Sequence, residues 1–323
     1  MKALRSQSLR QDLWQPIFLT LLLAACSMTT ENDGGPGDGL GPTPPPNQAA
    51  PVSTASEEVE DMPVNEVIVE CERHIRSWQV ANSSRRNDPT GDKILALEEA
   101  FARFIYRHKD ALTEVAIAGP ERSRGIASTS LGFSRDPSVK PILLNNLSDR
   151  SELVVANTLF GLAMLGDPDV PTAGLEAAIQ RPSASLALMR NAAFALVRLA
   201  QVRRSADPPL PVSEDWVRLM QHLLSRPEPE IRAQGASGLG YLGVSSAVPQ
   251  LANLLVGDPE SRVRFAAAFA LGEIGEQSAV EDLIGALQDP DSMTAGAARA
   301  ALTKIFGKDL GDDPSAWNAA IQN

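Results

Sequence analysis

The side chains that most often do chemistry in proteins are few among the 323 residues, which include two cysteines and three histidines. His74, His108 and His222 have no close acidic pair beside them, so the ligand spacing of a zinc site is missing. The acidic group within 309–313 lacks the spacing and the terminal Glu of an EF-hand. The chain has no Gly-x-Ser-x-Gly, phosphate-binding loop, His-Glu-x-x-His or Cys-x-x-Cys motif. We therefore expect a protein that is not an enzyme and that binds no metal or cofactor.

The net charge of −11 is unevenly distributed along the chain. Residues 27–72 carry ten acidic residues and no Lys or Arg, whereas residues 1–26 are net basic. Residues 73–323 are therefore nearly balanced in charge. An acidic chain in which only 5% of residues are aromatic has neither the basic footprint nor the stacking surface of a nucleic-acid-binding protein.

Residues 1–25 have the layout of a secretory signal peptide. Lys2, Arg5 and Arg10 precede an apolar run from Leu13 to Ala25. This run has about 13 residues, and a helix needs about 20 to span a bilayer. We therefore expect a cleaved signal peptide, and an uncleaved anchor or a buried helix is the alternative.

The end of this segment, Leu23-Ala24-Ala25-Cys26, resembles the lipobox of bacterial lipoproteins. In that family a peptidase cuts before the cysteine, whose thiol is diacylated. The resemblance implies that Cys26 is lipidated and becomes the first residue of the mature chain. Ser27, rather than Asp, follows it, and this implies the outer membrane. Two or more acyl chains would anchor the protein stably in the bacterial cell envelope.

Residues 26–63 are predicted to be a disordered, acidic tether rich in Gly and Pro. They show no apolar periodicity, so they cannot bury enough surface to offset the entropy of ordering. The acidic cluster Glu57-Glu58, Glu60 and Asp61 fits a solvated, self-repelling spacer, and a dedicated basic partner is the alternative.

Residues 64–118 are predicted to form two capping helices, because apolar residues recur at helical spacing from Val64 to Trp78 and from Ile94 to Val115. Cys71 lies on the first apolar stripe, and the acidic residues on either side of it would not stabilise a thiolate. We expect Cys71 to be a buried free thiol that acts as a small hydrophobe.

An internal repeat follows, and it covers more than half of the chain. Residues 228–258 align with 260–289 at an offset of 32, with Leu239-Gly240 matching Leu271-Gly272. Equivalent leucines recur at spacings of 31 to 34 residues, with one of 43: Leu131, Leu162, Leu196, Leu239, Leu271 and Leu302. The residue before each anchor leucine is small, which lets neighbouring helices approach closely.

Each repeat unit is predicted to hold two antiparallel helices. Gly166, Gly243 and Gly275 stand four residues after an anchor leucine, where a glycine commonly ends a helix. The second helices are expected at 139–147, 170–179, 212–224, 247–256 and 279–287. No stretch shows the sustained alternation of a strand.

This pattern resembles HEAT repeats, in particular the short HEAT-like kind that is also found in phycobiliprotein lyases. The resemblance implies an all-α fold, a right-handed α-solenoid (α-α superhelix) of about six helix-pair repeats over residues 119–306. The family often has a ladder of turn Asp and basic residues. Arg232 and Arg264 fit it, but Val155 and Ala295 interrupt it.

Two segments depart from the repeat. Residues 201–211 form an insertion, expected to be a surface loop, with a functional protrusion as the alternative. Residues 307–323 are predicted to form a C-terminal cap, in which Asp313-Pro314 starts a short helix and Trp317 folds over the last repeat.

The resemblance also implies a concave face that commonly binds a partner protein. We expect the second helices to line it, and their polar residues are the candidates for partner binding. The main candidates are Trp216, Arg218, Gln221, His222, Gln250 and Asn253. The other candidates are Lys140, Asn145, Asn146, Glu176, Glu281 and Asp282.

Together these features predict a lipid-anchored scaffold that mediates protein–protein interaction in the bacterial cell envelope. Its expected partners are a protein and, through the N-terminal lipid, the membrane. Two alternatives remain open. One is a structural envelope spacer without a specific partner. The other is a bilin-lyase-like activity, which suits an exported lipoprotein poorly.

Overall fold

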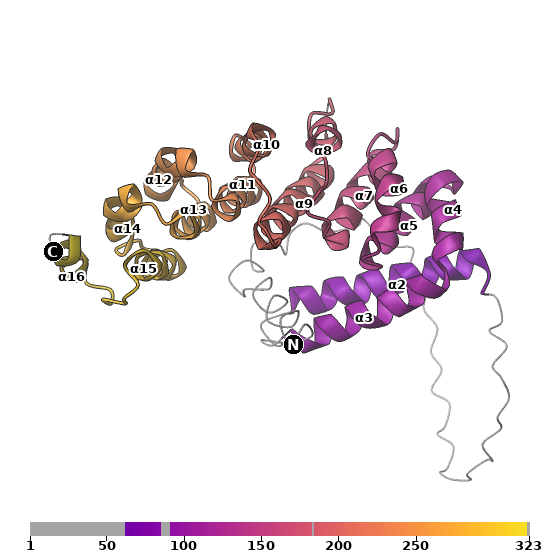
Figure 1. The fold of residues 1–323 in the computed structure, drawn as a ribbon, viewed down its shortest axis with the longest axis horizontal. Coiled ribbons are helices and arrows are strands. Elements are labelled where there is room, and N and C mark those ends of the chain that lie inside the picture. Colours follow the sequence, from indigo (N-terminus) through magenta and orange to yellow (C-terminus); the bar gives the residue numbers. More distant parts are fainter. Residues whose placement is uncertain (1–61, 85–90, 183, 322–323) are drawn as a thin grey trace, which may run out of the picture.

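A computed structural model describes residues 62–84, 91–182 and 184–321, and Figure 1 shows these residues as an arch of helices. The predicted signal peptide, Cys26 and nearly all of the predicted tether lie outside the described residues. The described part of the chain contains helices and no strand. None of its helices is long and apolar enough to cross a bilayer.

The α-helices of the described residues are α2 (Val64–Ser83), α3 (Asp92–Arg107), α4 (Lys109–Ala118), α5 (Glu121–Phe133), α6 (Lys140–Asn146), α7 (Glu152–Leu165), α8 (Thr172–Ile179), α9 (Leu186–Ser205), α10 (Glu214–Leu224), α11 (Pro229–Leu242), α12 (Val248–Gly257), α13 (Ser261–Ile274), α14 (Val280–Ala286), α15 (Ser292–Phe306) and α16 (Pro314–Ile321). Short 3-10 turns, η3 (Pro137–Val139), η4 (Ser245–Ala247) and η5 (Gln277–Ala279), precede α6, α12 and α14.

The helices from α4 to α15 form two rows (Figure 1). The inner row contains α5, α7, α9, α11, α13 and α15, and the outer row contains α4, α6, α8, α10, α12 and α14. Each outer helix pairs with the inner helix that follows it, which gives six helix pairs. The predicted all-α solenoid of about six repeats is confirmed.

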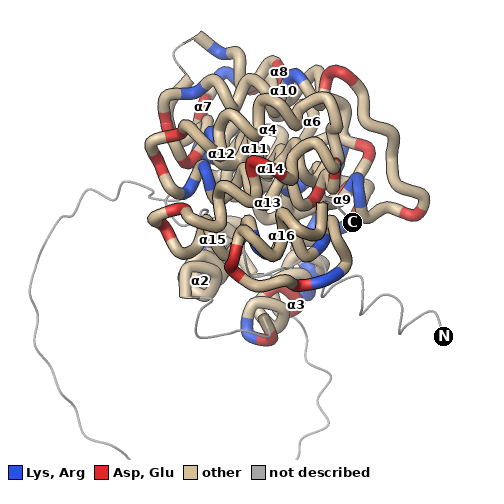
Figure 2. The backbone as a smooth tube through the Cα atoms, turned by 90° about the vertical axis from the view of Figure 1, so that its left-hand side faces the viewer, with Lys and Arg blue, Asp and Glu red and all other residues tan. Residues whose placement is uncertain are grey.

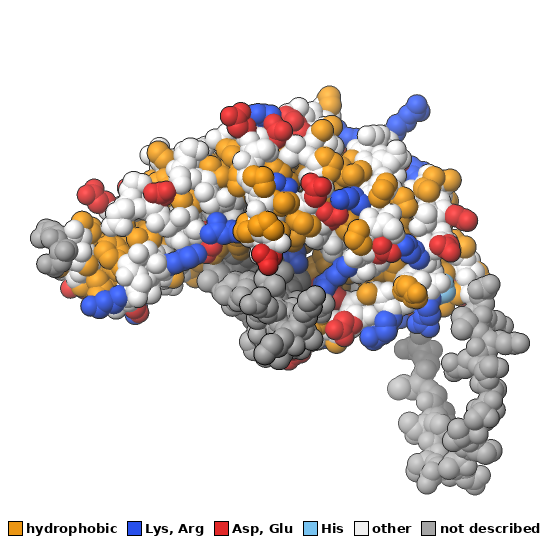
Figure 3. All heavy atoms as spheres, viewed as in Figure 1, with side chains coloured by type: hydrophobic (Ala, Val, Ile, Leu, Met, Phe, Trp, Pro, Cys, Tyr) orange, Lys and Arg blue, Asp and Glu red, His pale blue; other side chains and the backbone are white. Residues whose placement is uncertain are grey.

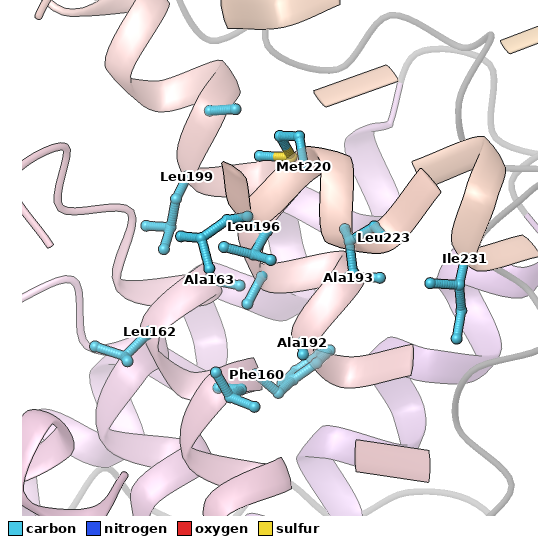
Figure 4. Close-up of a cluster of buried hydrophobic side chains, with 14 of the residues drawn as sticks. Phe160, Leu162, Ala163, Ala192, Ala193, Leu196, Leu199, Met220, Leu223 and Ile231 are labelled. Atoms are coloured by element: carbon cyan, nitrogen blue, oxygen red, sulfur yellow. The ribbon is translucent and has the colours of Figure 1, made fainter. Parts of the chain in front are cut away.

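The core runs continuously from one pair to the next. Figure 4 shows buried side chains of α7, α9 and α10 close together between the rows, among them Ala163, Leu196 and Met220. The anchor leucines Leu131, Leu162, Leu196, Leu239, Leu271 and Leu302 are all fully buried. The repeat spacing in the sequence therefore corresponds to one column of buried leucines along the whole arch.

Small residues set the curvature by letting the inner helices approach each other closely. A Cβ atom added to Gly132 would lie 2.0 Å from the carbonyl oxygen of Gly161. One added to Gly240 would lie 2.6 Å from the Cα atom of Ala270. Because close contact shortens the inner arc, the row of small contacts becomes the concave side.

We predict that Gly132→Ala lowers the free energy of unfolding by about 1–3 kcal/mol, because the added methyl group meets backbone rather than a flexible side chain. Gly285→Ala is the matched control, since no atom lies within 4 Å of its added Cβ. The control should be neutral or stabilising by up to about 1 kcal/mol. Urea unfolding followed by circular dichroism measures both, and equal stability of the two variants would contradict the packing argument.

Glycines end several of the inner helices as predicted. Gly166, Gly243 and Gly275 have φ angles of 63°, 66° and 77°, in the left-handed region that favours glycine. At the equivalent end of α5 stands Arg135, whose φ is 54°. A side chain there strains the backbone, so this arginine needs a compensating contact.

Three partly buried ion pairs join successive repeats: Arg124 with Asp149, Arg232 with Asp258, and Arg264 with Asp289. In each pair the guanidinium donates two hydrogen bonds to the carboxylate. The ladder is interrupted at Val155 and Ala295, as the sequence indicates, but Arg124 adds a pair that the sequence comparison missed.

The N-terminal helices differ from the prediction of two. The second predicted helix is divided at His108 into α3 and α4, and α4 joins the outer row as the partner of α5. The two helices appeared as one in the sequence because both bury an apolar stripe, with Ile105 in α3 and Leu112 in α4. Figure 2 shows α2 and α3 on the side away from the outer row. Cys71 of α2 is fully buried, as predicted, and burial raises the pKa of its thiol to about 12.

The predicted surface loop at 201–211 is partly wrong, because α9 continues to Ser205. Arg203 is 8% exposed and donates hydrogen bonds to the carbonyl oxygens of Pro168 and Pro211, at 2.7 and 2.9 Å. Its guanidinium also lies 4.9 Å from the centre of the Trp216 ring. Arg203 therefore fixes the connection between α9 and α10.

The predicted C-terminal cap is a helix, α16, that begins at Pro314. Trp317 is fully buried, and its Nε1–H donates a hydrogen bond of 2.8 Å to the carbonyl oxygen of Gly311. Asp309 and Asp312 form ion pairs with Arg299 of α15. The acidic residues of this segment therefore hold the cap against the last repeat through ion pairs.

Candidate partner-binding face

The predicted candidates lie on the outer row, so the expectation that the second helices line the concave face is wrong. Trp216, Arg218, Gln221 and His222 belong to α10, and Gln250 and Asn253 belong to α12. Both helices stand on the convex side of the arch (Figure 1). The small residues that bring the inner helices together explain the reversal, because they put the first helices on the shorter arc.

Trp216 is 2% exposed and packs in the core, so it does not contact a partner and the prediction for it is wrong. Arg218 is exposed and forms an ion pair with Asp215. His222 is half-buried, and burial and the charge of Arg226 lower its pKa. The remaining main candidates, Gln221, Gln250 and Asn253, are exposed on the outer row.

All six of the other candidates also lie on outer helices. Asn146 is buried and donates hydrogen bonds to the Ala116 carbonyl and to Ser128 Oγ, at 2.9 and 3.0 Å, so its role is structural. Lys140 forms an ion pair of 2.8 Å with Asp167. Asn145 and Glu281 are exposed, and Glu176 and Asp282 are half-buried.

The inner face is identified by what packs on it. Helix α2 lies on the inner side, and its Trp78 contacts Phe133 of α5 and Phe160 of α7 edge-on, with ring centres 5.7 and 5.6 Å apart. Phe160 stands two residues before its anchor leucine and Phe133 stands two residues after its own. Because the repeat is regular, the same two columns in the later helices also face inward.

These two columns differ in chemistry. The column before the anchor holds Phe160, Phe194 and Phe269, with Ser237 between the last two. The column after it holds Arg198, Tyr241, Glu273 and Lys304 in α9, α11, α13 and α15. Phe160 and Phe194 stack at 5.1 Å between ring centres, and Tyr241 contacts Phe269 at 5.4 Å. Two pairs of aromatic rings therefore lie along the inner face, and we call the rings on α9 to α13, namely Phe194, Tyr241 and Phe269, the aromatic strip.

A row of charged side chains flanks this strip on the side where the inner helices begin. Arg190 of α9 forms an ion pair of 2.8 Å with Glu230 of α11, and exposed Arg262 of α13 stands close enough to act on the same carboxylate. Burial opposes the ionised form of Glu230, but the hydrogen bond from Arg190 and the charge of Arg262 outweigh it and lower the pKa.

The row on the other side of the strip contains an ion pair of 2.7 Å between Lys304 and Glu273. Arg204, at the end of α9, reaches the carbonyl oxygens of Tyr241 and Glu273, each at 3.3 Å. The strip is thus bordered on both sides by charged groups in which cations predominate.

Helices α2 and α3 cover the N-terminal end of the inner face. Glu98 of α3 is 5% exposed and accepts a hydrogen bond of 2.9 Å from Trp78 Nε1, and it also pairs with Arg135. This partly buried ion pair is the contact that offsets the strained backbone of Arg135. Burial lowers the pKa of nearby Arg198 to about 10, although the Glu98 carboxylate acts in the opposite direction. Arg198 therefore stays protonated at neutral pH.

The inner face beyond α9 carries no described helix, and Figure 1 shows α11, α13 and α15 without α2 or α3 beneath them. Within the described ranges, no group of three or more His, Cys, Asp or Glu side chains is placed to hold a metal ion. The sequence did contain the inner columns, since Phe194, Phe269 and Tyr241 stand at fixed offsets from their anchor leucines. They were missed because the wrong helix of each pair was assigned to the concave side.

Residues 217–303 match the family model of HEAT repeats. Among solved structures, an engineered protein is 20% identical with a TM-score of 0.44, and the alignment covers 60% of this chain and 96% of that one. The complex of CpcE and CpcF of phycocyanin lyase from Nostoc is 15% identical with a TM-score of 0.37, over 85% and 98% of the two chains. A designed armadillo repeat protein is 15% identical with a TM-score of 0.43, over 60% and 98%. No curated protein sequence matches this chain.

The family match runs from α10 to α15, the region in which the helix pairs are α10–α11, α12–α13 and α14–α15. The described part of the chain is thus an α-solenoid in which residues 217–303 match HEAT repeats.

Proposed function

We propose that this chain is a non-enzymatic scaffold, held at a bacterial outer membrane by a lipid on Cys26, whose inner face binds a segment of a partner protein. The observation that carries the proposal is the aromatic strip on the inner face of α9 to α13. Its rings, Phe194, Tyr241 and Phe269, are half-buried, and charged side chains border them. Aromatic and Arg side chains are the types enriched at the energetic centres of protein interfaces.

The arrangement of the fold supports binding rather than catalysis. Several titratable groups of the inner face are held in ion pairs, such as Arg190 with Glu230 and Lys304 with Glu273. Cys71 is buried, and a thiol whose pKa is raised to about 12 is not nucleophilic at neutral pH. A curved row of repeats instead offers one extended surface, which is how solenoids recognise partners.

The support for the lipid anchor comes from the sequence. Leu23-Ala24-Ala25-Cys26 follows a basic and then an apolar segment, and the acidic, Gly- and Pro-rich residues 26–63 would separate the anchor from α2. An extended chain spans about 3.3 Å per residue, so such a tether would allow the folded part to stand well away from the membrane surface.

A photo-crosslinking experiment in the source cell tests the binding proposal. A photoreactive amino acid replaces exposed Ala300 on the inner side of α15, and the matched control replaces exposed Val256 on the outer helix α12. We expect a discrete crosslinked species from position 300 that is absent from position 256. Phe269→Ser should weaken this species by loss of the aromatic contact. A chain that gives no adduct at position 300, or equal adducts at both positions, would instead favour a structural spacer.

Metabolic labelling with a radioactive fatty acid tests the anchor. We expect the wild-type chain and a Cys71→Ala variant to incorporate label, and a Cys26→Ala variant to lose it, because the two cysteines of the chain differ in their predicted chemistry. Label that persists in Cys26→Ala would rule out lipidation at this residue.

A further inference from the structure

We propose that the segment bound by the inner face is an extended peptide in which acidic residues alternate with apolar ones. This inference rests on the proposed function and adds the chemistry of the partner.

Charge is divided between the two faces. On the inner face from α9 to α15, four cationic side chains, Arg190, Arg204, Arg262 and Lys304, stand against two carboxylates, Glu230 and Glu273. Arg198 adds a further positive charge beside α3. The outer helices α6, α8, α10, α12 and α14 hold five acidic side chains and two basic ones. Figure 3 shows acidic side chains along this outer edge.

The positive charge of the inner face is only partly neutralised by carboxylates of the protein itself. Glu230 accepts from Arg190 and Glu273 accepts from Lys304. Arg204 donates to neutral carbonyl groups, and Arg262 is exposed on the inner row. A carboxylate of a partner would therefore find guanidinium groups that still have charge and donors to offer. Opposite charges across an interface raise the association rate and exclude basic partners.

The aromatic strip accounts for the apolar residues of the proposed peptide. Phe194 and Phe269 lie between the row that contains Arg262 and the row that contains Arg204 and Lys304, and all three aromatic rings of the strip are half-buried. A segment that follows the strip would place apolar side chains on the rings and acidic side chains toward the cationic rows. Alternation of the two kinds is the pattern of an extended chain, whose successive side chains point to opposite sides.

The spacing of the helices gives the length of the segment. Neighbouring packed helices lie about 8–10 Å apart, so the three intervals from α9 to α15 span about 27 Å. An extended chain rises about 3.3 Å per residue, which makes the bound segment about eight residues long.

Fluorescence anisotropy with the purified full chain tests the inference. The probe is a labelled decapeptide of alternating Glu and Leu, and the comparison peptides replace Glu by Ser or by Lys. We expect the Glu–Leu peptide to bind at least about tenfold more tightly than either, and to bind less tightly at higher salt. Arg262→Glu should weaken it by at least about tenfold, whereas Arg218→Glu on the outer helix α10 should leave the affinity unchanged.

Other results would contradict the acidic partner alone, or the acidic partner together with the proposed function. Equal binding of the Ser–Leu or Lys–Leu peptide would overturn the acidic partner. Binding of heparin with no binding of any peptide would also overturn it, because the face would then recognise negative charge without apolar contacts. If no peptide binds but the crosslink at position 300 forms, the inference fails and the proposed function stands. If neither is observed, both fail.

Discussion

Trp317→Ala is expected to lower the free energy of unfolding by about 3–5 kcal/mol, the largest effect of any single aromatic truncation at the C-terminal end. Trp317 is fully buried, and its ring meets Phe306 of α15 edge-on at 5.5 Å between ring centres. Removing the ring leaves a cavity between α16 and the last repeat. It also leaves the Gly311 carbonyl without the indole donor.

The effect is large because, in the described part of the chain, the short helix α16 rather than another helix pair packs against α15. In a solenoid each repeat is stabilised mainly by its neighbours, so the final one depends on its cap. When α16 detaches, unfolding is expected to begin at this end and to spread along the row.

Urea unfolding measures this change. It is followed by the circular dichroism of the helices, a signal that does not rely on the tryptophan that is removed. Trp317→Phe keeps an aromatic ring but loses the Nε1–H donor, so it should cost less than alanine. Asn318→Ala, at an exposed position of the same helix, is the control and should change stability little. If Trp317→Ala is no less stable than the Asn318 variant, the cap does not support the last repeat.

The repeat pattern predicted the fold well because one physical requirement is repeated. Every unit must bury an anchor leucine and bring small residues against its neighbour, so positions such as Leu239 and Leu271 recur at a fixed spacing. The glycines that end α11 and α13, Gly243 and Gly275, recur for the same kind of reason, since the chain must reverse there with a positive φ. Such local requirements can be recognised in a single sequence.

The concave side could not be assigned in the same way. Which row forms the inner arc depends on how closely each row packs, and this involves contacts between units. The contact of Gly240 with Ala270 brings α11 and α13 together, and its partners are thirty residues apart in the sequence. The candidates on α10 and α12 followed from the opposite assignment. The inner aromatic columns were present in the sequence but were not assigned to a face.

The packing of α2 and α3 on the inner face also depends on contacts between residues that are far apart in the sequence. Glu98 of α3 meets Arg135 at the end of α5 and Trp78 of α2, and none of the three belongs to a repeated motif. The buried Glu98 looks like a polar residue beside an apolar stripe when the sequence is considered alone. Its role appears only when α2 and α3 are placed against the inner row.

Arg264→Ala is expected to lower the free energy of unfolding by about 3–5 kcal/mol, because it leaves Asp289 as a buried charge without its partner. Arg264 Nε and Nη2 donate to the Asp289 carboxylate at 2.7 and 3.0 Å, and the two side chains are only 14% and 7% exposed. Its Nη1 also donates to the carbonyl oxygens of Asp258 and Pro259. One side chain therefore joins two turns of the solenoid.

A double-mutant cycle separates the pair from the backbone contacts. If the ion pair provides most of the effect, Asp289→Ala and the double variant should be nearly as unstable as Arg264→Ala, so the two losses do not add. Arg218→Ala, which breaks the exposed pair with Asp215, should cost less than about 1 kcal/mol. Additive losses at Arg264 and Asp289 would mean that the two residues act separately.

The dependence of stability on pH gives an independent check of the same pair. The hydrogen bond from Arg264 lowers the pKa of Asp289 below its ordinary value of 3.8, although burial opposes this. A carboxyl group with a lowered pKa in the folded state contributes stability above its unfolded pKa and loses it as the pH falls through the folded value. The wild-type chain should therefore lose stability below about pH 4, with a smaller loss in Asp289→Asn, whose side chain does not titrate. Identical acid profiles for the two chains would show that this pair does not couple protonation to the packing of α13 against the turn before α15.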